Sequence, residues 1–112
     1  MIDVDTANAD AECGPIVSTL SLDPDMIELV EIFVAEVPDK VERIVSFEAS
    51  QNWPELKRAA HQLKGSAGGY GFDCLAPTCQ QLEQMLQEAP EPWQVAQLTQ
   101  LLVTQLLQLR AH

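Results

Sequence analysis

Apolar residues recur at helical spacing in five segments of this chain, and proline or glycine lies near the segment boundaries. Residues three and four positions apart share one face of an α-helix, so each segment can bury one stripe and leave the opposite face in water. No β-pattern of useful length competes with this periodicity. The pattern predicts helices over residues 24–36, 38–51, 53 to about 70, 73–76 to the break at Pro90, and 92–110.

The arrangement of these helices follows from the short connections between them, which favour antiparallel neighbours. We therefore expect an all-α fold, an up-down antiparallel four-helix bundle with the additional helix 24–36 packed across one end. The 112 residues fit one domain with a modest core. We expect a flexible acidic tail over residues 1–15 and the bundle domain over 16–112. Residues 16–20 are β-branched and apolar, but a lone strand would have no partner, so they should form an extended strap over the bundle.

Local signals place several helix ends. Asp23, followed by a proline, predicts an N-cap and a first helical residue. Pro38 removes a backbone donor and should break or kink the chain. Asn52 with Glu55 three residues later resembles a capping box at the start of the third helix. The cluster of glycines between positions 68 and 71 should end that helix near residues 69–71.

The helix that starts near residue 53 has an inner and an outer face. At about 100° per residue its apolar side chains fall within an arc of roughly 80°, and these residues are Leu56, Ala60, Leu63, Ala67 and Tyr70. His61, Gly65 and Gly68 share the opposite face, flanked by cations at positions 57, 58 and 64. The inner stripe should pack into the bundle, and the histidine should project into water.

Gly65 calls for an explanation, because a mid-helix glycine costs roughly 0.8–1 kcal/mol relative to alanine. It lies one turn after His61, so the bare backbone would let another protein approach the imidazole closely. The cations Lys57, Arg58 and Lys64 reverse the local sign of charge in an otherwise acidic chain. This face is therefore predicted to be a docking site with a histidine at its centre.

Composition excludes several functional classes. The formal net charge of −11 argues against nucleic acid and disfavours anionic membranes. Three cysteines, Cys13, Cys74 and Cys79, lack C-x-x-C spacing and companion histidines, so neither a disulfide framework nor a zinc site is indicated. We expect a reducing cytoplasm. The first residues carry no basic region followed by a long apolar run, so neither a signal peptide nor a membrane span is expected.

Two motifs resemble a known family. The run His61-Gln62-Leu63-Lys64-Gly65-Ser66, with Gly71 six residues after Gly65, resembles the H-x-L-K-G-S-x-x-x-x-G signature of histidine-containing phosphotransfer (Hpt) domains. The run Cys79-Gln80-Gln81-Leu82-Glu83 is similar to the C-x-x-L-E element of that family. The resemblance extends over roughly residues 22–110. It implies a four-helix bundle whose exposed histidine carries a phosphoryl group between receiver-domain aspartates in a two-component phosphorelay.

The resemblance also implies roles for residues. His61 would accept and donate the phosphoryl group at Nε2, because imidazole is substantially neutral near pH 7 and can act as a nucleophile. Lys64 would lie near the phosphoryl oxygens as a point charge. The partner would dock on Gly65, Gly68, Lys57, Arg58 and Gln62.

The expected partners are receiver domains of response regulators or hybrid histidine kinases. The acceptor aspartate and a divalent metal ion, expected to be Mg²⁺, would belong to the receiver, so this chain would need no cofactor of its own. It would be a monomeric phosphocarrier without autonomous catalytic activity. Consistent with that, no Gly-rich phosphate loop or Ser-His-Asp grouping is visible in the sequence.

Other interpretations remain open at this point. A helical adaptor could bind receiver domains or other signalling proteins without taking up phosphate. Cys79 lies in an apolar stripe and is predicted to be core filler, whereas His112 is terminal and expected to be disordered. Val45 and Phe47 could form the apolar part of a docking patch or belong to the peripheral core. Met1 and the acidic tail favour a free-standing protein.

Overall fold

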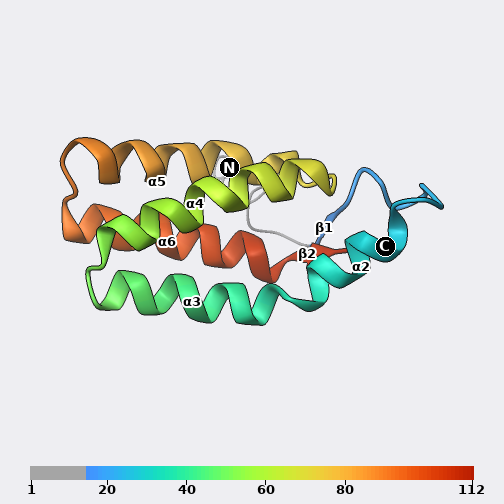
Figure 1. The fold of residues 1–112 in the computed structure, drawn as a ribbon, viewed down its shortest axis with the longest axis horizontal. Coiled ribbons are helices and arrows are strands. Elements are labelled where there is room, and N and C mark those ends of the chain that lie inside the picture. Colours follow the sequence, from blue (N-terminus) through green and yellow to red (C-terminus); the bar gives the residue numbers. More distant parts are fainter. Residues whose placement is uncertain (1–14) are drawn as a thin grey trace, which may run out of the picture.

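Four long helices form the body of the molecule, which is known from a computed structural model that describes residues 15–112. Each helix runs antiparallel to the one before it, and α3 also packs on α6, which closes the bundle (Figure 1). The all-α antiparallel bundle predicted from the sequence is confirmed. The four helices are α3 (Val37–Ala49), α4 (Trp53–Gly69), α5 (Ala76–Glu88) and α6 (Pro92–Leu107).

A single apolar core fills the space between the helices. In α4 the buried residues are Leu56, Ala60, Leu63 and Ala67, as the predicted stripe requires, and Tyr70 is half-buried at its end. In α5 the stripe of Cys79, Leu82 and Leu86 is buried, after Leu75 of the short 3₁₀ helix η1 (Asp73–Leu75). Burying these stripes against one another supplies the main stabilising free energy of the fold.

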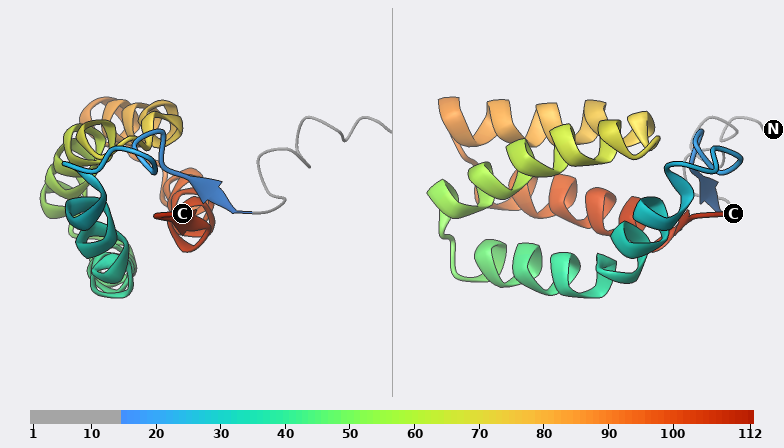
Figure 2. Two further views of the ribbon diagram at one scale, coloured as in Figure 1. Left: turned by 90° about the vertical axis from the view of Figure 1, so that its right-hand side faces the viewer. Right: turned by 45° about the vertical axis from the view of Figure 1, so that its right-hand side comes forward.

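The helix α2 (Ile27–Ala35) closes one end of the bundle, beyond the body of the four long helices (Figure 1; Figure 2). Its Phe33 ring lies 5.0 Å from the Tyr70 ring and 5.8 Å from the Phe72 ring, measured between centroids. Val30 of the same helix is fully buried. The additional helix therefore packs at one end of the bundle, as predicted, and the structure shows that this is the end where α4 stops.

Two helix ends and one helix cap differ from the sequence predictions. α2 begins at Ile27 instead of residue 24, because the Asp23 carboxylate accepts the backbone N–H of Asp25 and stabilises a turn. The predicted capping box is absent, since Asn52 makes no side-chain cap hydrogen bond although the helix does start after it. α6 ends at Leu107 and not at residue 110.

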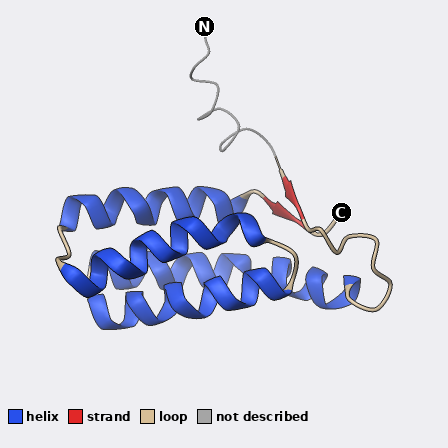
Figure 3. Ribbon diagram, turned by 90° about the horizontal axis from the view of Figure 1, so that it is seen from above, coloured by secondary structure: helices blue, strands red, loops and turns tan. Residues whose placement is uncertain are grey.

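The segment after α6 is a strand, and this overturns the prediction that residues 16–20 have no strand partner. β1 (Ile16–Val17) pairs in parallel with β2 (Leu109–Arg110) at one end of the bundle (Figure 3). The chain then crosses that end, where the Ser18 hydroxyl donates to the Tyr70 carbonyl at 2.7 Å. It is a strap, as expected, but a hydrogen-bonded one that joins the two terminal segments to the end of α4.

His112 is also positioned, contrary to the expectation of disorder. Its Nε2 lies 2.7 Å from a carboxylate oxygen of Glu31 on α2. The predicted acidic tail and Cys13 lie outside the described residues except for Pro15. Within residues 15–112, none of the helices is both long and apolar enough to span a membrane.

Candidate functional site

His61 projects from the outer face of α4 with 66% of its side chain exposed. Its Nδ1 lies 2.7 Å from a carboxylate oxygen of Glu83, which α5 presents beside α4. An ionised carboxylate only accepts hydrogen bonds, so in the neutral ring Nδ1 carries the proton and donates it. Nε2 then keeps its lone pair and has no partner among the described residues. The ring is thus held in the tautomer whose free nitrogen is a nucleophile.

Glu83 holds Lys64 as well as His61. The Lys64 Nζ donates to the other carboxylate oxygen of Glu83 at 3.3 Å. Burial raises the pKa of Glu83, but the hydrogen bonds and charges of His61 and Lys64 outweigh burial and hold the pKa below its ordinary value. The carboxylate is therefore ionised near neutral pH, and it links the nucleophile to the nearest cation.

The sequence reasoning gave Glu83 no role. The signal was present in the C-x-x-L-E element, because Glu83 follows buried Cys79 by one helical turn and flanks buried Leu82. That spacing puts Glu83 at the edge of the apolar stripe of α5. Its meeting with His61, 22 residues earlier, depends on how α4 and α5 pack and cannot be read from local sequence.

The two glycines of the outer face have different surroundings. A Cβ added at Gly65 would meet no atom within 4 Å, so nothing in the fold requires a glycine there. A Cβ added at Gly68 would touch a carboxylate oxygen of Asp73 at 3.4 Å, an ordinary contact. Gly65 therefore leaves open space beside His61, whereas Gly68 lies against the start of η1.

The other predicted docking residues spread around α4. Arg58 pairs with Glu55 one turn earlier at 3.6 Å, and Lys57 makes no ion pair with any residue in the described part of the chain. Gln62 faces α3, away from Glu83, and lines a cavity of about 180 Å³ between the two helices. We call this cavity the α3–α4 notch, and its lining is Lys40, Arg43, Ile44, Ala59, Gln62, Leu63 and Ser66.

The residues left open by the sequence can now be placed. Burial raises the pKa of the Cys79 thiol to about 12; the charge of Lys64 opposes this shift and that of Glu83 adds to it. The thiol therefore stays protonated, and Cys79 is a buried core residue, as predicted. Phe47 packs against the core, whereas Val45 is 43% exposed on α3. Of the two, only Val45 belongs to the surface.

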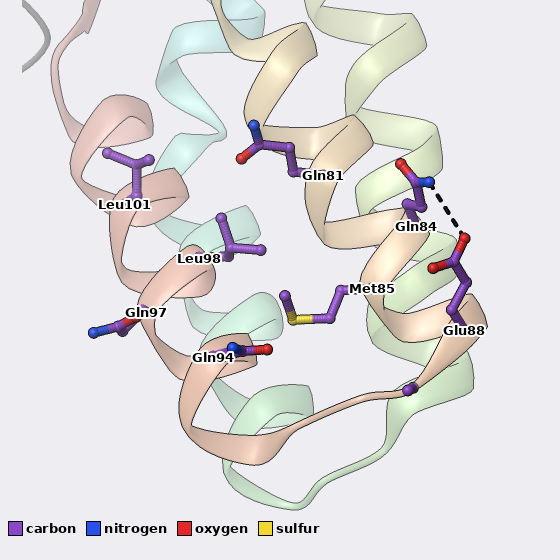
Figure 4. A pocket seen from close by; sticks show the side chains of 9 residues that line it. Gln81, Gln84, Met85, Glu88, Gln94, Gln97, Leu98 and Leu101 are labelled. Atoms are coloured by element: carbon purple, nitrogen blue, oxygen red, sulfur yellow. Dashed lines mark hydrogen bonds between the residues drawn. The ribbon is translucent and has the colours of Figure 1, made fainter.

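A larger hollow of about 650 Å³ lies on another face, between α5 and α6. Figure 4 shows Met85 and Leu98 reaching into it from the two helices, with glutamines around the rim and a 3.3 Å hydrogen bond from Gln84 to Glu88. Its lining includes no histidine and no cation. Despite its size, this hollow lacks the groups that the phosphotransfer role expected from the sequence would require, so the His61 face remains the candidate site.

The described residues contain no group of three or more His, Cys, Asp or Glu side chains that could hold a metal ion. The only acidic side chain bonded to His61 within residues 15–112 is Glu83, and it is shared with Lys64. The site therefore combines the exposed imidazole of His61, the nearby cation of Lys64 and the open space beside Gly65.

Comparison with known proteins agrees with this geometry. The family model of the Hpt domain matches residues 28–112, which includes all four long helices and both motifs. The chain belongs to the Hpt domain family. Hpt domains are phosphotransfer modules of two-component phosphorelays, and they act there as phosphocarriers that interact with receiver domains.

A curated relative points the same way. This Hpt domain is 37% identical over 65 residues to the sensor protein TorS of Escherichia coli (strain K12), a match that covers 58% of this chain and 7% of TorS. The chain thus spans a small fraction of that relative's length. No solved structure gives a significant match.

Proposed function

We propose that this Hpt domain accepts a phosphoryl group at Nε2 of His61 from the aspartyl phosphate of a receiver domain and donates it to another receiver aspartate. The observation that carries the proposal is the hydrogen bond of 2.7 Å between Nδ1 and Glu83, which leaves Nε2 free in an exposed ring. An in-line displacement at phosphorus needs such an unencumbered nucleophile.

The transfer step balances without further reactants. The Nε2 lone pair forms a bond to phosphorus as the bond from phosphorus to the aspartate oxygen breaks, and the aspartate leaves as a carboxylate. The proton stays on Nδ1, so positive charge develops on the ring. Glu83 accepts that N–H and stabilises the charge. Donation to the next aspartate is the reverse of the same step.

Lys64 and Gly65 complete the proposed roles. Lys64 Nζ lies on the Glu83 side of the site and would contribute positive charge toward the phosphoryl oxygens. Gly65 would leave room for the partner, and Lys57, Arg58, Gln62 and Gly68 would border its docking surface. We propose that the divalent metal ion, expected to be Mg²⁺, is held by the receiver, where it supplies further positive charge to the phosphoryl group.

The proposal is tested by mixing the chain with isolated receiver domains carrying a radiolabelled phosphoryl group. Label should move to the unmodified chain and not to the His61→Gln variant, which should fold equally well because the ring is exposed. Binding of receivers without any transfer of label would support the adaptor instead. Phosphoramidate, a small phosphoryl donor that needs no docking surface, reports separately on the reactivity of His61.

Lys64→Ala is expected to slow transfer while leaving stability almost unchanged. A unit charge about 4 Å from another contributes about 1 kcal/mol in water and more where the interface excludes water, which corresponds to at least roughly a fivefold change in rate. The ion pair with Glu83 is half-buried and has a long N–O distance of 3.3 Å, and in the variant Glu83 keeps its bond to His61, so the loss in folding stability should be small. Rapid-quench kinetics and thermal melts measure both quantities, and unchanged kinetics would remove the role assigned to Lys64.

Glu83→Gln is expected to lower transfer roughly ten- to hundredfold, because hydrogen bonds to charged groups contribute about 1.5–3 kcal/mol. The amide oxygen can still accept from Nδ1, but it does not offset the charge that develops on the ring. Nitrogen NMR of the imidazole should show a larger share of the Nε2–H tautomer in the variant. A variant that is slow but keeps the unmodified tautomer population would argue against this positioning role.

The stability that Glu83 adds to the fold should depend on pH, and the Glu83→Gln variant can show this. The pKa of Glu83 is lowered in the folded state, so its pairing stabilises the fold above the pKa of the unfolded chain and is lost as pH falls through the folded value. Denaturant melts should therefore show the unmodified chain more stable than Glu83→Gln near neutral pH. The two curves should converge in acid, and a constant gap between them would contradict this account.

A further inference from the structure

The α3–α4 notch lies on the flank of α4 opposite to Glu83. Two of its lining residues are next to the predicted site in sequence, since Gln62 directly follows His61 and Ser66 directly follows Gly65. The nucleophile thus stands between two features, the Lys64–Glu83 pair on the α5 side and this notch on the α3 side. A protein that covers His61 closely enough for phosphoryl transfer would also cover the mouth of the notch.

The notch has an apolar floor and a polar rim. Ile44 and Leu63 are buried at its base. At the rim, the Arg43 guanidinium and the side chains of Gln62 and Ser66 form no hydrogen bond or ion pair with any residue of the range 15–112. Lys40, by contrast, is already paired with Glu36 at 3.2 Å. Arg43 is therefore the free cation of the notch.

Size restricts what can enter. Sites for cofactors and drug-sized ligands enclose roughly 300–1,000 Å³, whereas the notch measures about 180 Å³. That volume suits one inserted side chain. An apolar floor matches a methylene stem, and a guanidinium with two neutral hydrogen-bonding groups matches a carboxylate at its end.

Charge favours an acidic partner at this place. The chain has a formal net charge of −11, yet five of its six Lys and Arg residues lie on α3 and α4. These two helices also carry four acidic residues, so together they have a net charge of +1 and the rest of the chain has −12. An acidic surface would be repelled by most of the molecule and attracted here, which orients its approach. The α5–α6 face offers no cation within Ala76–Leu107.

We propose that the α3–α4 notch receives a glutamate or aspartate side chain of the receiver domain that docks over His61, with Arg43 as its ion-pair partner. This inference rests on the proposed function and makes Arg43 a determinant of partner choice. Arg43 would act on docking and not on the chemical step, since it lies on a different helix from the nucleophile and has no contact with it.

The test compares Arg43→Glu with Arg110→Glu, which makes the same change in net charge at the strand end of the molecule. The probe is a phosphorylated receiver domain chosen because it transfers to the unmodified chain. Arg43→Glu should raise KM for transfer by roughly tenfold, with kcat nearly unchanged and a weaker dependence on salt. Arg110→Glu should change KM less than twofold. Equal effects of the two variants would overturn the inference.

Two further measurements separate the possible failures. Ala59→Leu, which fills the notch from α4 without changing charge, should also raise KM, and both variants should still take phosphoryl from phosphoramidate at the unmodified rate. Reversing one acidic residue of the receiver should restore transfer to Arg43→Glu, and a scan of its acidic surface that finds no such residue contradicts the inference. If the unmodified chain takes label from no receiver, the proposed function fails as well.

Discussion

Replacing Gly71 by alanine is expected to destabilise the fold by about 2–5 kcal/mol, a large part of the 5–15 kcal/mol typical of a domain. Gly71 has φ of +85°, where a side chain costs about 1–2 kcal/mol. A Cβ there would also collide with the Ser18 hydroxyl and lie 2.9 Å from the backbone nitrogen of Thr19, and such overpacking costs about 1–3 kcal/mol. Chemical denaturation measures the loss.

Gly69→Ala is the matched control, since a Cβ at Gly69 would meet no atom within 4 Å. That variant should be as stable as the unmodified chain or more stable by up to about 1 kcal/mol, because alanine favours the helix. If both variants melt alike, the strap does not constrain Gly71. The expected difference would show that the last glycine of the Hpt motif serves the closure of the bundle end, remote from the phosphoryl chemistry.

Features that depend on neighbours in sequence were predicted well. The stripe of α4, the break before α3 and the glycine-rich end of α4 each follow from residues within a few positions of one another. Even the exposure of His61 follows from its angle relative to Leu63 and Ala67. Helical periodicity and proline chemistry are local, so the bundle could be predicted from the chain alone.

Features that depend on distant pairing were missed. Leu109 continues the apolar stripe of α6, so it predicts helix, yet it pairs with Ile16 and forms a strand. The capping pattern at Asn52 is present in sequence and α4 starts directly after it, but the side-chain cap hydrogen bond does not form. Glu83 became part of the site only through the contact between α4 and α5.

Replacing Gly65 by phenylalanine is expected to lower transfer from a receiver by about a hundredfold or more, while stability stays equal or rises slightly. Helical side chains lean toward the N-terminus, so a ring at position 65 would cover the turn that carries His61. Even a misplacement of about 1 Å at a reacting centre can reduce the rate about a hundredfold. A Cβ at this position meets no atom of the fold, which leaves stability to helix propensity alone.

Gly65→Ala provides the graded control, because a methyl group should cost little transfer and should raise stability by about 0.8–1 kcal/mol. Labelling by phosphoramidate separates docking from chemistry, since a small donor can reach Nε2 past a neighbouring ring more easily than a protein can. The phenylalanine variant should therefore lose transfer from receivers far more than labelling by the small donor. Equal losses would mean that position 65 affects the imidazole itself, and full transfer from receivers would mean that the partner approaches His61 from another side.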